Sequence, residues 1–261
     1  MRTSTPTLTL PPVGLGTMGI GDPETIATAL EVGYRHLDTA QIYDNEGVVG
    51  EGFALSDVPR DDLTVATKVW ADSLAPEAVH ETTDESLGRL GLETIDLLYV
   101  HRPIETYEPD RTLPAFDDLR EAGTIEHVGL SNFSVAQLEE ALEILESPIA
   151  AHQVEYHPLF QPTELLEHAQ EHDYLLVAYS PLAAGRLEEV DAVVAVAEKH
   201  DTTPEAVSLA WLSAKDNLVT IPKASRRDHL EANLAALDVE LDAEDHDRID
   251  GIEREVEIFP E

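Results

Sequence analysis

The chain has 261 residues, with 53 acidic and 16 basic side chains, no Cys, and a formal net charge of −37. A surface this negative repels the phosphates of nucleic acids and of anionic membranes, so we expect neither kind of partner. The lack of Cys excludes disulfides, thiolate nucleophiles and zinc sites with Cys ligands.

The chain length and apolar content indicate one folded domain over residues 1–261. Hydrophobic residues make up 43% of the chain, enough to form a large core, and no Gly/Ser linker divides it. No apolar run approaches the roughly 18 residues of a membrane-spanning helix, and the first residues lack the apolar core of a signal peptide. We therefore expect a soluble, cytoplasmic monomer.

Short apolar runs rich in β-forming residues recur along the chain, and an amphipathic stretch follows each of them. Helix-start signals such as Asp22-Pro23 and Thr203-Pro204 lie between the runs. Alternation of this kind predicts an α/β fold with a parallel sheet, here a single (β/α)8 TIM barrel of the usual length of roughly 250 residues. The expected strands cover residues 12–18, 34–40, 63–69, 95–101, 126–132, 151–157, 174–180 and 218–222.

A glycine motif follows the first expected strand. The segment from Gly14 to Gly19 fits the dinucleotide pattern G-x-G-x-x-G, with Asp38 at about the distance of the usual acidic partner. However, prolines interrupt the preceding strand, and the helix starts at Asp22-Pro23, beyond the last glycine. We therefore interpret the motif as a strand end, not as a Rossmann turn.

Polar side chains lie at or just past the ends of the expected strands. In a barrel, the carboxyl ends of the strands meet at one face, where active sites are built from several strands. We therefore expect these side chains to share one site. They are Asp38, Lys68, His101, Ser131, Asn132, Gln153 and Tyr179.

These strand ends resemble the conserved segments of the aldo-keto reductase superfamily. The resemblance extends in family order from residue 13 to about residue 235, and it is closest to the prokaryotic diketogluconate-reductase-like branch. It implies reduction of aldehydes and ketones to alcohols with NAD(P)H. The segments that carry it are residues 37–43, 67–68, 100–101, 129–133, 152–158, 178–182 and 221–223.

Four residues match the catalytic positions of the family, and their chemistry suits the reaction. Tyr43 would donate a proton to the carbonyl oxygen, and the Lys68 ammonium would lower the tyrosine pKa from its usual value of about 10. Asp38 would hold Lys68 as an ion pair. His101 would orient the carbonyl and stabilise the oxyanion.

The resemblance also implies a set of cofactor contacts. Tyr179 would stack on the nicotinamide, and Lys223 would pair with the 2′-phosphate of NADPH. Ala224 and His229 depart from the family pattern at that end, so we expect NADPH to be preferred only modestly, with NADH possible. The other implied contacts are Gly16, Thr17, Ser131, Asn132, Gln153, Ser180, Leu182, Arg226, His229 and Asn233.

We expect Met18, Trp70 and Arg102 to form walls of the substrate pocket. The short segment 102–111, with a tail that ends soon after the last helix, predicts a relatively open pocket, suited to a small carbonyl substrate such as an aldehyde or a keto-sugar. Arg102 would attract an anionic substrate or pair with Glu105.

Two other functions fit parts of the sequence. The first is a non-catalytic, nicotinamide-binding regulatory subunit. The second is a zinc hydrolase, because residues 168–172 fit the pattern H-x-x-E-H. We expect no metal, because His168 and His172 lie on a connecting helix, where a solvated polar face is the simpler interpretation.

The charge pattern resembles the surfaces of halophilic proteins. Only four of the basic residues are Lys, and carboxylates are spread over the whole chain. Molar salt shortens the Debye length to about 3 Å and would screen their repulsion. The alternative is an ordinary acidic cytosolic protein.

Overall fold

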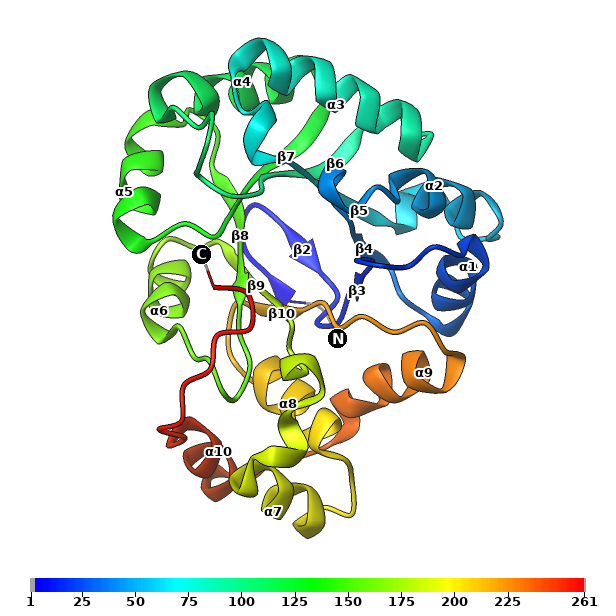
Figure 1. The fold of residues 1–261 in the computed structure, drawn as a ribbon, viewed down its shortest axis with the longest axis vertical. Helices are drawn as coiled ribbons and strands as arrows, with labels where there is room; N and C mark the ends of the chain where they lie inside the picture. Colours follow the sequence, from blue (N-terminus) through cyan, green and yellow to red (C-terminus); the bar gives the residue numbers. More distant parts are fainter. Residues whose placement is uncertain (1–2, 261) are drawn as a thin grey trace.

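The computed structural model describes residues 3–260 and contains a parallel sheet of eight strands that closes on itself (Figure 1). A parallel bridge between Val13 and Thr220 joins the two edges of the sheet, with Gly14 N donating to Thr220 O at 2.8 Å. This arrangement confirms the predicted (β/α)8 barrel. The strands, in sheet order, are β3 (Leu15–Gly16), β4 (His36–Asp38), β5 (Thr64–Val69), β6 (Ile95–Val100), β7 (Ile125–Ser131), β8 (Ile149–Glu155), β9 (Leu175–Tyr179) and β10 (Leu218–Thr220).

Helices surround the strands on the outside of the barrel (Figure 1). The start signals at Asp22-Pro23 and Thr203-Pro204 act as caps: the Asp22 carboxylate accepts from Glu24 N, and Thr203 Oγ accepts from Ala206 N. The α-helices are α1 (Pro23–Val32), α2 (Glu46–Ala54), α3 (Pro76–Leu90), α4 (Pro109–Glu121), α5 (Val135–Ile144), α6 (Thr163–Glu171), α7 (Asp191–Lys199), α8 (Pro204–Ser213), α9 (Arg227–Ala235) and α10 (Ala243–Asp250). Short 3-10 turns are η1 (Gln41–Tyr43), η2 (Arg60–Asp62), η3 (Ala71–Ser73), η4 (Ala183–Gly185), η5 (Leu187–Glu189) and η6 (Ala236–Asp238).

An antiparallel hairpin that the sequence did not indicate precedes the barrel. It consists of β1 (Thr3–Ser4) and β2 (Thr9–Leu10). Leu8 and Leu10 are buried in one cluster with inward-facing strand residues such as Leu97 and Val177. The hairpin therefore fills the interior of the barrel with apolar side chains, and in Figure 1 β2 is visible within the ring of strands.

The apolar core has two layers, because successive side chains of a strand point to opposite faces. In β6, Leu97 and Tyr99 face the interior of the barrel, whereas Leu98 and Val100 pack under the helices. All six residues of β6 are buried. None of the helices in residues 3–260 combines the length and apolar character needed to span a bilayer.

Candidate active site

A cavity of about 440 Å³ lies at the carboxyl ends of the strands. Met18, Ile42 and Ile104 line it although each is more than two-fifths exposed, and exposed apolar side chains gathered in a pocket are typical of a ligand site. The lining includes these residues expected from the sequence: Gly16, Thr17, Met18, Asp38, Tyr43, Trp70, His101, Arg102, Ser131, Asn132, Gln153, Tyr179, Ser180 and Lys223.

A buried ion pair lies next to the cavity: Asp38 is part of the lining, whereas Lys68 is fully buried and is not. Lys68 Nζ lies 2.5 Å from Asp38 Oδ1 and donates a further hydrogen bond to Thr39 O at 2.8 Å. Burial alone lowers the pKa of Lys68, but the charge of Asp38 and the contact with Tyr43 outweigh it and raise the pKa above its usual value. The structure therefore favours the charged, ammonium form of Lys68 at the end of β5.

Gln153 fixes the second oxygen of the same carboxylate. Its Nε2 donates to Asp38 Oδ2 at 2.7 Å, and both side chains are buried. Because β4 and β8 stand four positions apart in the sheet order, this bond spans the interior of the barrel. Asp38 thus accepts from two different strands, and the contact between Gln153 and Asp38 could not be predicted from the sequence.

Tyr43 lies above the ion pair, at the end of the η1 turn that follows β4. Lys68 Nζ is 5.1 Å from the centroid of the Tyr43 ring. The Tyr43 ring is in edge contact with His101 at 5.9 Å between centroids, and Trp70 contacts His101 from another side at 4.9 Å. The phenol and the imidazole are therefore neighbours on the cavity wall.

His101 is a neutral base in this environment. Burial, with the positive charges of Lys68 and Arg102, lowers its pKa to about 2. Its Nδ1 is buried and has no hydrogen-bond partner among residues 3–260, while Asn132 Nδ2 donates to its carbonyl at 2.9 Å. The side chain can thus donate one hydrogen bond as a neutral imidazole but carries no charge at neutral pH.

The ends of β7 and β9 form a polar network beside the imidazole. The Tyr179 hydroxyl donates to Asn132 Oδ1 at 3.0 Å, and Ser131 Oγ donates to Gln153 O at 2.9 Å. Asn132 adopts a left-handed backbone with φ of 60°, which Asn tolerates better than most residues. The network fixes the Tyr179 ring as part of the cavity wall.

The residues at this end fit a nicotinamide ring and its carboxamide. An aromatic ring, two side-chain amides and a hydroxyl line one cavity whose exposed surface is mainly apolar. Such a combination of an apolar pocket with a few placed polar groups is typical of cofactor sites. Tyr179, Asn132, Gln153 and Ser131 are the side chains that could hold the ring.

The glycine motif is explained by closure of the barrel. A Cβ on Gly16 would lie 2.6 Å from Ile221 O, so only glycine allows β3 to approach the segment after β10 so closely. The helix that follows begins at Pro23, after the last glycine of the motif. Thr17 then donates from both its backbone N and its Oγ to Asp38 O.

The residues expected around the adenosine are not gathered in the cavity, apart from Lys223. Arg226 forms an exposed ion pair with Asp228. His229 is exposed on α9, and Asn233 on the same helix is buried. Within the described part of the chain, the cavity lining omits Leu182, Arg226, His229 and Asn233.

The carboxyl-terminal segment supplies a wall that the sequence did not indicate. Ile258 N and Phe259 N donate to the two oxygens of Glu155 at 2.6 and 2.9 Å, and Phe259 and Pro260 line the cavity. Figure 1 shows the segment returning from α10 to the side of β8 and β9. The short tail after α10 therefore contributes side chains to the pocket wall.

Arg102 contacts this segment. Its guanidinium donates to Phe259 O at 3.4 Å, and among residues 3–260 it forms no ion pair with Glu105. Burial alone raises the pKa of Glu155, but hydrogen bonds from His157 and from the two backbone amides lower it overall. A buried carboxylate thus anchors the segment that Arg102 touches.

The H-x-x-E-H segment begins on α6 at His168 and ends at His172, the residue that caps the helix, and within residues 3–260 neither histidine belongs to the cavity lining. The expectation of a solvated polar face was wrong for His168, which is 6% exposed. Its ring bonds the Tyr174 hydroxyl and the carboxylate of Glu139 on α5, so a polar side chain is buried with its partners.

Comparisons with known proteins agree with this geometry. The model of the Aldo/keto reductase family matches residues 12–254. Methylglyoxal reductase DkgB of Salmonella typhi is 36% identical over 93% of this chain and 92% of its own, and glyoxal reductase of Bacillus subtilis is 34% identical over 96% and 92%. The crystal structure of a putative 2,5-diketo-D-gluconic acid reductase B superimposes with a TM-score of 0.91 at 33% identity, covering 95% of this chain and 90% of that one. The chain therefore belongs to the Aldo/keto reductase family, whose members reduce carbonyl groups with a nicotinamide cofactor.

Proposed function

We propose that this protein reduces small aldehydes and ketones to alcohols, with Tyr43 as the proton donor and NADPH as the preferred cofactor. One observation carries the proposal: a buried ammonium, held by Asp38 at 2.5 Å, lies 5.1 Å from the ring of a tyrosine on the cavity wall. An ammonium at this position favours the phenolate that remains when Tyr43 gives up its proton.

Each residue of the site has a separate task in this proposal. The nicotinamide, when bound, supplies a hydride to the carbonyl carbon. Tyr43 donates its proton to the carbonyl oxygen, and Lys68 stabilises the resulting phenolate. His101 cannot be the acid, because its lowered pKa of about 2 keeps the ring neutral. It donates a hydrogen bond that orients the carbonyl and stabilises the developing oxyanion.

The pocket walls support a small substrate. Met18, Trp70 and Arg102 line the cavity together with Phe259, and these walls leave room for an aldehyde or a keto-sugar. The printed names of similar proteins, methylglyoxal reductase and glyoxal reductase, refer to small carbonyl compounds. Arg102 would favour substrates that carry a negative charge near the carbonyl.

The cofactor preference rests on Lys223. This side chain lines the cavity and is exposed, so its charge is open to a 2′-phosphate. Arg226 and Arg227 are already paired with Asp228 and Glu31, which weakens the attraction of their charges for a 2′-phosphate. We therefore propose a modest preference for NADPH, on the order of tenfold or about 1.4 kcal/mol.

We further propose that residues 1–261 form one domain that works as a monomer in a salt-rich cytoplasm. The excess of 53 acidic over 16 basic residues, of which four are Lys, supports this setting. High salt would screen repulsion between the carboxylates.

The proposal is tested with Tyr43→Phe. Loss of the general acid should lower kcat at least roughly 10²-fold, while the affinity for NADPH stays the same. Turnover is followed by loss of NADPH absorbance with a panel of aldehydes and ketones, and affinity by quenching of protein fluorescence. The matched control is Tyr156→Phe, since the buried Tyr156 hydroxyl has no partner in the described residues and lies outside the cavity lining.

Two results would contradict the proposal. A Tyr43→Phe enzyme that keeps more than about a tenth of the wild-type kcat would remove Tyr43 from the role of acid. A wild-type protein that binds NADPH but reduces no carbonyl compound would favour the non-catalytic regulatory subunit.

A further inference from the structure

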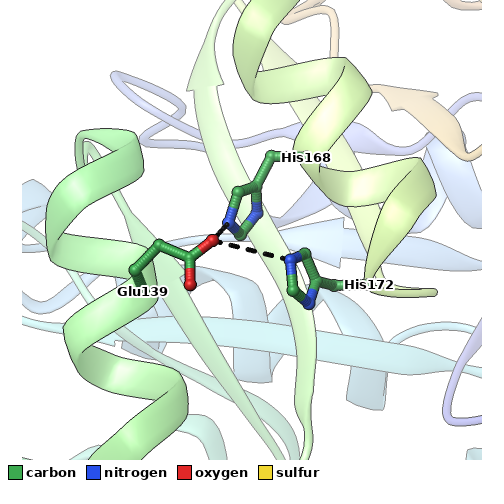
Figure 2. Close-up of side chains that lie close together, drawn as sticks. All are labelled: Glu139, His168 and His172. Carbon is green, nitrogen blue, oxygen red and sulfur yellow. Dashed lines mark hydrogen bonds and ion pairs between the residues drawn. The ribbon is translucent and has the colours of Figure 1, made fainter.

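Three potential metal ligands meet on the outer layer of the barrel, between α5 and α6. Figure 2 shows the imidazoles of His168 on α6 and of His172, which caps α6, turned toward the carboxylate of Glu139 on α5. His168 Nε2 lies 3.0 Å and His172 Nε2 3.7 Å from the same oxygen, Glu139 Oε1. The ligand atoms of the three residues all lie within 4.8 Å of one another. Small side-chain rotations would therefore bring them onto one ion.

The backbone arranges the two histidines for chelation. Residues four apart on a helix project from the same face, one turn above the other. The His168 and His172 rings are stacked, with centroids 4.3 Å apart and planes 27° apart. Two imidazole nitrogens and one carboxylate oxygen form a ligand set that zinc commonly takes in proteins, with water in the remaining position.

The imidazole of His168 has a second partner that fixes its orientation. His168 Nδ1 is 2.7 Å from the hydroxyl of Tyr174, which is buried beneath α6. A hydroxyl both donates and accepts, so it supports either tautomer of the ring. His168 can therefore bond Glu139 through a protonated Nε2, or bind a metal through a bare Nε2 while Nδ1–H donates to Tyr174. Support of this kind is typical of metal-binding histidines.

Exposure and charge both favour entry of a cation. The His168 side chain is 6% exposed, whereas those of His172 and Glu139 are 31% and 57% exposed. One ligand is thus fixed by packing and two face solvent, which leaves a path for the ion. The net charge of −37 raises the local concentration of cations around the whole molecule.

We propose that Glu139, His168 and His172 form a binding site for a divalent transition-metal ion of the zinc class that joins α5 to α6. The site lies outside the lining of the catalytic cavity, so the metal has no role in carbonyl reduction. Because the ion would bind the folded protein and not the unfolded chain, it would stabilise the fold.

The first experiment titrates untagged wild-type protein with zinc chloride in molar KCl, where scattered binding to surface carboxylates is screened. Calorimetry should show one zinc ion per chain, and saturating zinc should raise Tm by roughly 5 °C. Magnesium chloride at the same concentration should do neither, because Mg²⁺ prefers oxygen ligands.

The second experiment compares three variants. His172→Gln and Glu139→Gln should each weaken zinc binding at least roughly tenfold and abolish the rise in Tm, since each removes one ligand. Both side chains are partly exposed, so the variants should fold. The matched control is His80→Gln, which removes an exposed imidazole 4.0 Å from Asp118, across α3 and α4. It should bind zinc as the wild type does.

The results separate this site from the proposed catalysis. Without added zinc, His172→Gln should reduce carbonyl compounds at the wild-type rate, because it changes nothing in the cavity. The proposal is overturned if the wild type takes up no stoichiometric zinc. It is equally overturned if both ligand variants bind zinc as tightly as the wild type.

Discussion

The carboxyl ends of the strands and the hairpin that packs inside the barrel use buried space in opposite ways. At the carboxyl ends, the buried carboxylate of Asp38 accepts hydrogen bonds from the buried side chains of Lys68 and Gln153. Around the hairpin, Leu8 and Leu10 meet other apolar side chains. Burying a charged group is costly unless it is paired, whereas burying an apolar side chain stabilises the fold directly. The first region should therefore govern turnover and the second stability.

The strongest test of this division is Lys68→Met. Loss of the ammonium should lower kcat at least roughly 10²-fold, because the phenolate of Tyr43 then forms without a neighbouring positive charge. Steady-state turnover of carbonyl compounds checks this, with Lys215→Met as the control, since Lys215 pairs with Asp250 outside the cavity.

Lys68→Met also leaves the Asp38 carboxylate buried without its cation, which would destabilise the fold. The double variant Asp38→Asn, Lys68→Met removes both charges and separates the two effects. It should regain thermal stability and remain inactive. If the double variant regained activity together with stability, the ion pair of Asp38 and Lys68 would be structural only. The carboxyl ends of the strands would then not differ from the hairpin in the way described.

Leu10→Ala tests the other region. Removing a fully buried leucine should lower the free energy of unfolding by about 2–5 kcal/mol, as cavities in apolar cores do. Denaturant titration measures the loss, and kcat per folded molecule should stay at the wild-type value. Leu55→Ala, at a side chain that is 58% exposed, should change stability by less than about 0.5 kcal/mol. A fall in kcat for Leu10→Ala would mean that the two regions are coupled.

Lys223→Ala tests the proposed role of Lys223 in the choice of cofactor. The substitution should remove most of the proposed tenfold preference for NADPH and leave turnover with NADH unchanged, because only the 2′-phosphate distinguishes the two cofactors. Values of kcat/KM for both cofactors measure the change. A wild-type enzyme that prefers NADH would show that Lys223 does not select the cofactor.

The smallest expected effect concerns the negatively charged surface of the whole molecule. Raising KCl from about 0.1 M to molar levels should increase Tm by a few degrees, because salt screens the repulsion within a net charge of −37. A thermal melt in each buffer measures it. Equal Tm values would contradict the halophilic interpretation. They would not affect the roles proposed for the catalytic residues and for the apolar hairpin.

The barrel and the family were predictable because their signals are local. Apolar runs ending in Asp38, Lys68 and His101 indicate strands that finish at one face, and the structure has strands ending at or next to each of these residues. The hairpin was missed because β1 and β2 have two residues each, too few to show an alternating pattern.

Contacts between distant segments left no sign in the sequence. Glu155 meets Ile258 across 103 positions, and nothing in either segment alone indicates that one anchors the other. The burial of His168 was missed for the same reason, since it depends on Glu139 from the preceding helix.

The bridge between Val13 and Thr220 has a consequence for how the chain is made. The first edge of the barrel finds its partner only when a segment about 200 positions later has left the ribosome. At roughly 5–20 residues per second, synthesis takes about 10–40 s to supply it. An unpaired strand edge invites association with other chains. We therefore expect nascent chains to depend on the mutual repulsion of their acidic side chains until the ring closes.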